Sequence, residues 1–291
     1  MLNTFIKYRR TLDFVIIDTY STYSFYYAWL IARLSFFFKI PYIPILHGGN
    51  LPQKLSSSPT LTQQVFHHAY CNVAPSDYLQ TALAKYGYKT AVIPNFILIQ
   101  QYLFRKREQV RPRLLWVRSF EKTYNPTMAV KVLASLKEKY PDATLCMVGP
   151  DKDGSLAQCQ QLAVDLKLAD RITFTGKRSK ADWHHLAQDY DIFINTTNAD
   201  NTPVSVIEAM ALGLPVVSTN VGGIPYLLKD TATALLIPPS DTSAMVNAIT
   251  QLVENNTLAK RLSETARHEV EAFDAAIVLA KWGDLLGNER V

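Results

Sequence analysis

Six short apolar segments, rich in β-branched residues, recur along the second half of the chain and limit the folds available to it. They are Leu114–Val117, Ala143–Val148, Arg171–Phe174, Asp191–Asn195, Pro215–Thr219 and Ala234–Ile237. Helical patterns separate them, and Asn125 and Asp241 are the predicted caps of two of these helices. Strands that alternate with helices form a parallel sheet covered by helices. This half therefore predicts a complete doubly wound α/β domain, whose ligand crevice lies at the carboxyl ends of the strands.

The first half repeats the alternation over four predicted strands: Phe14–Tyr20, Tyr42–His47, Tyr70–Pro75 and Ala91–Pro94. Residues 98–112 interrupt this alternation of strands and helices. They contain a glutamine pair and a basic triplet, which indicates a linker. We therefore predict a partial domain at residues 1–97, a second domain at 113–272 and a separate final helix at 273–291. The continuous apolar pattern of Phe14–Tyr20 is typical of a central strand, yet no strand precedes it, so we expect an exposed apolar edge.

One predicted helix begins just after Asp200 and leads directly into the strand that begins at Pro215. Thr202 is its predicted N-cap and Pro203 its first-turn proline, because the N–H that proline lacks has no helical partner there. Gly213 suits the positive φ at the helix C-terminus, and Pro215 prevents the helix from continuing.

A second helix start follows that strand, where Gly222 and Gly223 lead to Pro225. Helix N-termini offer free amides and a favourable dipole to an anion, so the two starts predict an anion site. Asp200 precedes the first of these helix N-termini and Glu208 follows it. Carboxylates beside such a site fit the binding of sugar hydroxyls while the amides hold phosphate.

Four charged side chains near these helix starts are candidates for function. Arg118 follows a strand end and Lys122 lies shortly after it, so both could reach a diphosphate over the glycine amides; the alternative is two surface residues on a loop. Glu208 lies among apolar residues of its predicted helix, where a carboxylate that is merely solvated is rare. For Asp200 the alternative is an N-cap or turn residue.

His47 follows a predicted strand and precedes two glycines, which fits a histidine that faces a cleft; the alternative is a structural histidine. The adjacent histidine pairs at 67–68 and 184–185 point to different helix faces and predict no metal site. Residues 151–154 lack the full spacing of a calcium loop, which favours a surface turn. No dinucleotide or Walker pattern is present, and no nucleic-acid motif accompanies the basic residues, so we expect no nucleic-acid partner.

Composition places the chain among globular proteins with a sizeable core, since 48% of its 291 residues are apolar. Its three cysteines have no metal-type spacing, which favours a reducing compartment. Residues 1–10 are polar and basic, with no cleavage site after them, so we expect no secretory signal and a cytoplasmic protein.

The charge is uneven. Residues 1–110 carry 11 Lys/Arg against 4 Asp/Glu, a net +7, whereas residues 111–291 carry 19 against 21, a net −2. A basic first half fits an anionic membrane surface or an acidic ligand, and the alternative is chance surface charge. The apolar and aromatic segment Tyr23–Phe38 is too short to span a membrane. It predicts either a buried helix or one lying on the inner membrane surface with Phe36–Phe38 inserted.

These motifs together resemble those of GT4-type retaining glycosyltransferases of the GT-B fold, from Asp13 to the C-terminal helix. The strongest match is Asp200-x7-Glu208 followed by Ala-Met-Ala-x-Gly-x-Pro-Val-Val and Gly-Gly-Ile-Pro. Supporting matches are His47-Gly48, Val73-Ala-Pro-Ser76, Ile93-Pro-Asn95, the strand end at Arg118, and Val148-Gly149.

The resemblance implies two Rossmann-like doubly wound parallel-sheet domains, the first without its initial strands, and a final helix that crosses back to the first domain. It implies transfer of a sugar from a nucleotide-diphosphate sugar, with retention of configuration and without a metal or other cofactor. The implied catalytic residues are Asp200 near the transferred sugar, Glu208 on the ribose, His47 facing the sugar and Arg118 on the diphosphate. The implied donor contacts are Lys122, Gly149, Asn201, Thr202, Pro203, Val204, Gly222 and Gly223.

Three departures from the family pattern accompany the match. Asp200 stands where the family has glutamate, and Lys122 lies closer to Arg118 than its family counterpart does. The family's first strand and glycine-rich loop are absent, so we expect a truncated gene or another chain that supplies the missing strands.

The main hypothesis is thus a glycosyltransferase acting on a glycan or lipid-linked acceptor, at the inner face of the membrane. The alternatives are an inactive or half-site partner subunit that binds nucleotide sugar but needs another chain, and a GT-B sugar-nucleotide epimerase.

Overall fold

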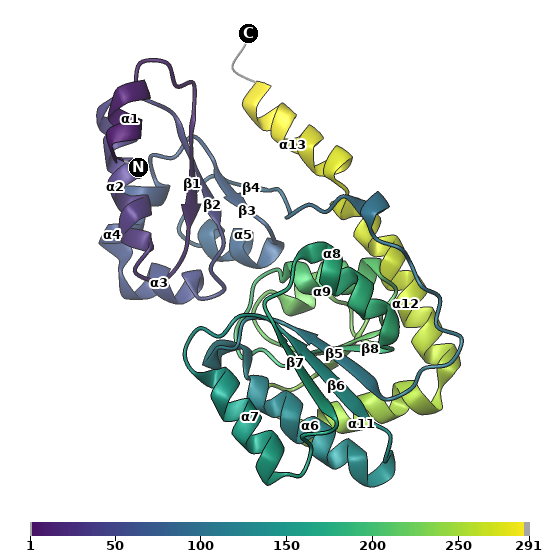
Figure 1. Ribbon diagram of the computed structural model, residues 1–291. Helices are drawn as coiled ribbons and strands as arrows, with labels where there is room; N and C mark the ends of the chain where they lie inside the picture. The colour runs from purple at the N-terminus through teal and green to yellow at the C-terminus, as the bar shows by residue number, and fades with distance from the viewer. Residues whose placement is uncertain (1, 288–291) are drawn as a thin grey trace. The chain divides into compact units, whose positions relative to one another are not determined.

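The computed structural model describes residues 2–287, which form two compact units (Figure 1). Unit 1 contains residues 2–95, 200–202 and 281–287, and unit 2 contains residues 96–199 and 203–280. The end of the predicted C-terminal segment, residues 288–291, lies outside the described residues.

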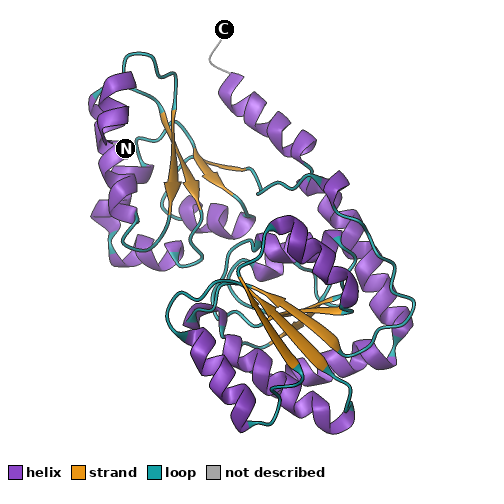
Figure 2. Ribbon diagram, in the orientation of Figure 1, coloured by secondary structure: helices purple, strands orange, loops and turns teal. Residues whose placement is uncertain are grey.

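Unit 1 is built on a four-stranded parallel sheet of order β1-β2-β3-β4 (Figure 2). Its strands are β1 (Val15–Thr19), β2 (Tyr42–Leu46), β3 (Asn72–Ala74) and β4 (Thr90–Val92). Its helices are α1 (Leu2–Tyr8), α2 (Phe25–Phe37), α3 (Leu51–Ser57), α4 (Pro59–Phe66) and α5 (Asp77–Ala84). The four predicted strands are confirmed, and β1 is an edge strand with Ile16 52% exposed. The helices α1 and α3 were not predicted from the sequence.

The helix α2 has one face in the core and one face in solvent. Phe25, Ala28, Ile31, Ala32 and Ser35 are buried. Tyr26 and Phe37 are 52% and 76% exposed. The prediction of a helix buried on all sides is therefore wrong for the outer face, because only the inner face packs against β1, β2 and α4.

Unit 2 contains a six-stranded parallel sheet of order β10-β9-β8-β5-β6-β7. Its strands are β5 (Arg113–Val117), β6 (Thr144–Val148), β7 (Ile172–Gly176), β8 (Ile192–Asn195), β9 (Val216–Thr219) and β10 (Leu235–Ile237). Its helices are α6 (Pro126–Lys139), α7 (Ser155–Asp165), α8 (Lys180–Leu186), α9 (Val204–Ala211), α10 (Ile224–Leu227), α11 (Thr242–Glu254) and α12 (Asn256–Val270). Short 3₁₀ turns are η1 (Ile99–Gln101), η2 (Lys122–Tyr124), η3 (Ala187–Asp189) and η4 (Glu271–Phe273). The six predicted strands and the doubly wound architecture are confirmed.

The strand β5 shows how the sheet of unit 2 separates two cores. Leu114 and Trp116 belong to one buried cluster, with residues of α6 and α11. Leu115 belongs to a second cluster, with residues of α9 and α12. Side chains alternate between the two faces of a strand, so a continuous apolar run is buried on both sides.

The final helix α13 (Ala275–Gly287) begins in unit 2, and its residues from Lys281 onward are grouped with unit 1. The predicted helix is present with nearly the predicted bounds. That it crosses back to the first domain stays a prediction.

Two helix caps differ from those predicted. The N-cap of α9 is Pro203, not Thr202, and no side chain caps this helix. Asn125 is the N-cap of α6, but its backbone is left-handed (φ 46°) and its side chain makes no capping bond. Asp241 caps α11 as predicted, accepting a hydrogen bond from the Ala244 amide at 2.8 Å.

The basic segment before β5 is fixed to unit 2 by the buried side chain of Arg107. Its guanidinium donates to the carbonyl oxygens of Gly213 and Tyr190 at 2.7 and 2.9 Å, and Asp191 lies 3.8 Å away. Burial and, to a smaller extent, the neighbouring Arg105 lower the pKa of Arg107 to about 10, and Asp191 opposes the shift. A guanidinium so buried is retained because nearly all its donors find acceptors.

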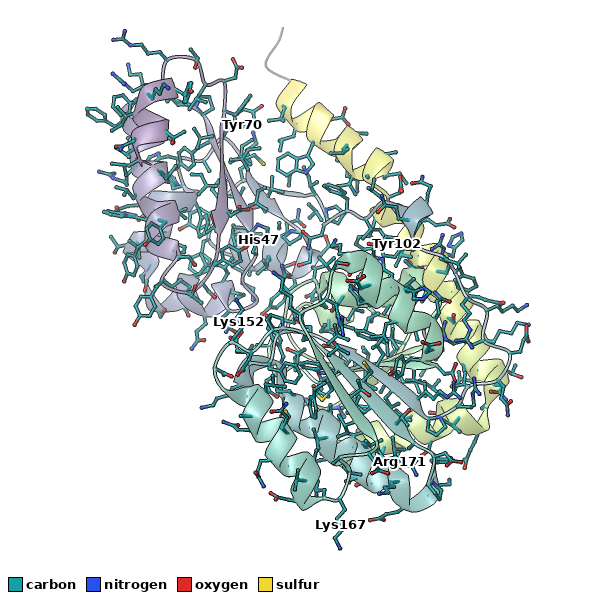
Figure 3. All side chains as sticks on the ribbon, in the orientation of Figure 1. His47, Tyr70, Tyr102, Lys152, Lys167 and Arg171 are labelled. Carbon is teal, nitrogen blue, oxygen red and sulfur yellow. The ribbon has the colours of Figure 1, made fainter. Side chains whose placement is uncertain are left out.

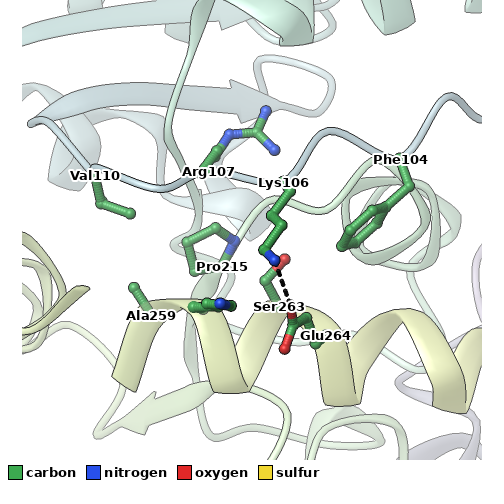
Figure 4. Close-up of a pocket in the computed structure, with 9 residues that line it drawn as sticks. Phe104, Lys106, Arg107, Val110, Pro215, Ala259, Ser263 and Glu264 are labelled. Carbon is green, nitrogen blue, oxygen red and sulfur yellow. Dashed lines mark ion pairs between the residues drawn. The ribbon is translucent and has the colours of Figure 1, made fainter. Parts of the chain in front are cut away.

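A small cavity beside Arg107 lies between this segment and α12 (Figure 4). Lys106 and Glu264 form an ion pair of 3.8 Å across it. The segment predicted as a linker thus packs along unit 2.

Candidate active site

The strand order of unit 2 reverses direction between β5 and β8, because the chain runs from β5 to β7 on one side and from β8 to β10 on the other. In open α/β sheets, ligands bind at the carboxyl ends of strands beside such a switch point. Arg118 follows β5, and the loop of residues 196–203 follows β8 and leads into α9. Two of the predicted functional segments therefore flank the switch point.

Arg118 is held against an aromatic ring at this point. Its guanidinium carbon lies 4.1 Å from the centroid of the Tyr124 ring, in a cation–π arrangement. Desolvation lowers the pKa of Arg118, and Tyr124 and Glu121 oppose that shift. An arginine already stripped of much of its water interacts more strongly with a phosphate than a fully hydrated one does.

Gly149 allows the ends of β5 and β6 to approach closely. A Cβ at this position would lie 1.7 Å from the carbonyl oxygen of Arg118, so no other residue fits without moving the backbone. The Arg118 amide in turn donates to the Val148 carbonyl at 3.0 Å. Gly149 therefore sets the backbone position of Arg118.

Lys122 lies in the turn η2, and its side chain is exposed. Its backbone amide donates to Asp153 Oδ2 at 2.9 Å. The predicted turn at residues 151–154 thus fixes the loop that carries Lys122, and the phosphate contact of the ammonium group stays a prediction.

Hydrogen bonds join the loop that follows β8 to the loop that follows β5 and to the strands β5 and β9. Thr196 Oγ1 donates to the carbonyl of Tyr124 at 2.8 Å and accepts from Trp116 Nε1 at 3.0 Å. Thr219 Oγ1 donates to the carbonyl of Thr197 at 2.6 Å. The first bond connects two loops, and the other two connect the loop after β8 to the strands β5 and β9. Side chains therefore hold together the edge of the sheet that carries the candidate residues.

The helix α9 presents its N-terminus at this edge, just after Pro203. The first amides of a helix, here those of Val204 and Ser205, have no partner inside it. The hydroxyl of Ser205 is also buried without a hydrogen-bond partner among the described residues. Donors that lack partners at a helix N-terminus fit an anionic ligand.

The second predicted helix start contributes less. Gly222 has a positive φ of 54°, as expected of a glycine turn, and Gly223 is the N-cap of α10. However, α10 has only four residues, so its dipole is small.

Glu208 is buried on α9, where three polar side chains surround one of its oxygens, Oε1. The Tyr102 hydroxyl donates to it at 2.9 Å, Lys180 Nζ lies 3.0 Å away and His184 Nε2 lies 3.8 Å away. Burial alone would raise the pKa of Glu208, but His184, Lys180 and Tyr102 together lower it. Glu208 is thus a buried carboxylate held in its charged form.

The contacts of Tyr102, Lys180 and His184 with Glu208 were not predicted from the sequence. Tyr102 lies in the segment predicted as a linker. His184 belongs to a histidine pair that predicted no metal site. The position of Glu208 on an apolar helix face was a sequence signal for such partners, because a buried charge requires them.

Unit 1 holds His47 at the end of β2. Figure 3 labels this histidine. Its Nε2 lies 2.7 Å from Asp18 Oδ1, and its ring stacks on Tyr20 with 5.0 Å between centroids. Asp18 was also missed, although the parallel register of β1 and β2 brings the two strand ends together. The Asp18 carboxylate fixes the orientation of the imidazole.

Residues 200–202 are grouped with unit 1. The amide oxygen of Asn201 accepts a hydrogen bond from Ser76 Oγ at 2.5 Å. The Thr202 carbonyl accepts from Asn95 Nδ2 at 3.3 Å. Ser76 and Asn95 belong to motifs that the sequence analysis had singled out.

The predicted residues therefore divide between the units. Unit 1 contains His47, Asp200, Asn201 and Thr202. Unit 2 contains Arg118, Lys122, Gly149, Pro203, Val204, Glu208, Gly222 and Gly223. Their functional roles stay predictions.

Within residues 2–287, no helix is long and apolar enough to cross a membrane. In the same residues no group of three or more His, Cys, Asp or Glu side chains is arranged to hold a metal ion.

The model of the family described as glycosyl transferases group 1 matches residues 101–269, which is more than half of the chain. The chain belongs to this family. The match contains the whole sheet of unit 2 together with Arg118 and Glu208.

Curated relatives agree with this assignment. The chain is 34% identical over 134 residues to the D-inositol 3-phosphate glycosyltransferase of Mycobacteroides abscessus, covering 44% of this chain and 30% of the relative. It is 26% identical over 198 residues to the N-acetyl-alpha-D-glucosaminyl L-malate synthase of Bacillus anthracis, covering 65% and 51%. The matched part thus spans about half or less of the length of these relatives.

Solved structures share the fold of this glycosyltransferase family member over nearly its full length. Anabaena HepE in complex with UDP superimposes with a TM-score of 0.85 at 20% identity, covering 99% of this chain and 82% of that one. Sucrose-phosphate synthase from Thermosynechococcus elongatus gives a TM-score of 0.83 at 19% identity, covering 99% and 76%. The fold class is GT-B, as predicted.

Proposed function

We propose that the chain transfers a sugar from a nucleotide-diphosphate donor to a hydroxyl of a glycan or lipid-linked acceptor, with retention of configuration. The observation that carries the proposal is the arrangement around the switch point of unit 2. A half-buried arginine and a helix N-terminus with partner-free donors flank it, and a buried carboxylate lies on the same helix.

In this proposal the bond between the sugar C1 and the diphosphate oxygen breaks, and its electron pair leaves with the nucleoside diphosphate. The acceptor hydroxyl forms the new bond to C1 and gives its proton to the departing diphosphate. Negative charge grows on the diphosphate as the bond breaks. Arg118 and the first amides of α9 would stabilise that charge, and fixed donors of this kind are worth about 3–4 kcal/mol each.

Glu208 would bind the ribose hydroxyls of the donor, since an ionised carboxylate accepts hydrogen bonds with both oxygens. Tyr102, Lys180 and His184 all approach the same oxygen of Glu208. We expect Lys180 to move on donor binding, because its side chain is 68% exposed and holds no other ion pair among the described residues.

We also propose that the reaction needs no metal ion, because Arg118, the α9 amides and Lys122 could neutralise the diphosphate. Excess EDTA should then leave activity unchanged. Activity that is lost with EDTA and restored by a divalent cation would refute this part.

The acceptor side is proposed to lie at the inner face of a membrane. The net charge of +7 over residues 1–110 supports attraction to anionic lipid.

Donor binding tests the proposal directly. A thermal-shift screen of UDP, GDP and ADP sugars should raise the melting temperature of the wild-type chain with one of them. Glu208→Gln keeps the shape of the side chain but removes its charge, and it should abolish both the shift and donor hydrolysis. Lys131→Gln, an exposed change on α6, serves as the control. The site assignment fails if Glu208→Gln binds and hydrolyses the donor as the wild type does.

The exposed edge of β1 favours a second candidate, a nucleotide-binding subunit that needs a further strand from another chain. A long apolar edge strand is a template for such pairing. Size-exclusion chromatography with an activity assay separates the two, because an active monomer would exclude the partner subunit.

A further inference from the structure

We propose that unit 1 docks on an anionic lipid bilayer through the outer faces of α1 and α2, here called the aromatic face. It comprises exposed side chains on these two helices and directly beside α2, namely Leu2, Ile6, Tyr8, Tyr23, Tyr26, Tyr27, Phe36, Phe37 and Phe38. The inference rests on the proposed function for its purpose, since a lipid-linked acceptor lies in a membrane. Its test, however, measures binding without any sugar donor.

The side chains of the aromatic face are distinct from those of α2 that pack in the core. The inner face of α2 is already buried, yet Tyr23, Tyr27 and Phe37 remain 89%, 64% and 76% exposed. Exposed apolar patches of this kind mark interaction sites.

Two contacts join α1 and the residue after it to the end of α2. The ring of Phe5 in α1 lies 6.2 Å from the ring of Phe38, centroid to centroid. The guanidinium carbon of Arg9 lies 5.4 Å from the centroid of the same Phe38 ring. The basic end of α1 therefore lies at the aromatic end of α2.

Charge identifies a bilayer as the occupant. The sequence has no Asp or Glu before Asp13 and none between Asp18 and Asp77. The same two stretches contain the basic residues Lys7, Arg9, Arg10, Arg33, Lys39 and Lys54. A surface with cations and no acid near it is attracted to anionic headgroups, whereas a protein partner is normally matched by both signs.

The residue types and helix length support the same occupant. Tyrosine and phenylalanine beside Arg and Lys are typical of helices that lie in the headgroup region. At 13 residues α2 is well short of the roughly 20 needed to span the hydrocarbon core. We therefore infer that α2 lies along the surface and inserts its outer rings.

Flotation with lipid vesicles, at low salt and without nucleotide sugar, tests the inference. The wild-type chain should float with phosphatidylglycerol vesicles and remain behind with pure phosphatidylcholine vesicles. Tyr23→Ser, Tyr27→Ser and Phe37→Ser combined should abolish flotation while leaving the fold intact, because these side chains are the most exposed of the face. Arg33→Gln with Lys39→Gln should weaken binding about fivefold per residue.

Matched controls change exposed residues outside the face. Tyr86→Ser, Val164→Ser and Leu166→Ser combined, and Lys85→Gln with Lys131→Gln, should float as the wild type does. The inference is overturned if the wild-type chain ignores anionic vesicles, or if face and control variants lose binding equally. It is also overturned if light scattering shows a wild-type dimer that the face variant converts to a monomer. If the chain binds vesicles but binds no sugar donor, the proposed function is refuted and the membrane inference stands.

Discussion

The hydroxyl of Tyr102 donates a hydrogen bond of 2.9 Å to the buried carboxylate of Glu208, from a segment 106 positions earlier in the chain. Both residues belong to unit 2, and both are at most 5% exposed. The bond holds one oxygen of the carboxylate and leaves the second available to a ligand. Burial and the negative charge of Glu208 both raise the pKa of Tyr102, so the hydroxyl stays protonated and remains a donor.

Tyr102→Phe should weaken donor binding without removing the charge of Glu208. The lost bond is to an ionised group, which is worth about 1.5–3 kcal/mol. We expect this loss in the free energy of unfolding, measured by urea denaturation, together with a higher KM for the donor. Tyr140→Phe is the control, since its hydroxyl bonds the exposed Glu254. Unchanged stability and KM in Tyr102→Phe would mean that this hydrogen bond does not position the Glu208 carboxylate.

The stabilising effect of Glu208 should depend on pH. Its pKa in the folded protein lies below the ordinary value of 4.5, so the unfolded chain takes up the proton first on acidification. The stability gained from the charged carboxylate is therefore complete well above pH 4.5 and is lost as the pH falls through the folded pKa. The difference in unfolding free energy between wild type and Glu208→Gln, measured from pH 7 to pH 3, should shrink toward acid. A difference that moves further in favour of the wild type on acidification would contradict the lowered pKa.

Gly149→Ala should disrupt the site, whereas Gly154→Ala should not. Both glycines have positive φ, but a Cβ at Gly154 would meet nothing within 4 Å. At Gly149 it would collide with the Arg118 carbonyl and displace Arg118, so we expect loss of donor turnover on the order of 10²-fold. Gly154→Ala should cost only the strain of the left-handed backbone, about 1 kcal/mol. Equal kinetics of the two variants would show that the close contact at Gly149 does not position Arg118.

Arg107→Met should destabilise unit 2 strongly. The substitution leaves several carbonyl oxygens without their donor and removes one of the three arginines that lie near the fully buried Asp191. Breaking a buried charge pair costs about 3–5 kcal/mol. Lys131→Met on the exposed side of α6 should have little effect. Chemical denaturation of both variants measures the difference. A loss below about 1 kcal/mol in Arg107→Met would mean that the contacts of Asp191 with Arg105 and Arg111 suffice.

The sequence was most informative where one residue type decides the local structure. Strands such as β5 and β8 are buried on both faces, so a short apolar run is enough to locate them. Gly213 has φ 76° at the end of α9, as the sequence indicated, because only glycine adopts that backbone freely.

Where tertiary contacts decide, local patterns were insufficient. The hydroxyl of Thr202 lies 3.5 Å from the Pro75 carbonyl and does not cap α9. The helix α3 contains Gln, Lys and Ser, and its two buried leucines, Leu51 and Leu55, give too short a period to recognise. The partners of Glu208 come from a linker and from α8, and no local spacing connects them.

The hydrogen bonds that join the loop after β8 to the loop after β5 and to the strand β9 have a further consequence. A site whose loops are already ordered loses little conformational entropy when a ligand arrives. Binding of the diphosphate should therefore leave the backbone of residues 196–198 nearly unchanged in its hydrogen exchange. The part of the site that adapts to the donor would be the exposed Lys180 side chain. Donor selectivity would then depend on the motion of this side chain over a rigid backbone.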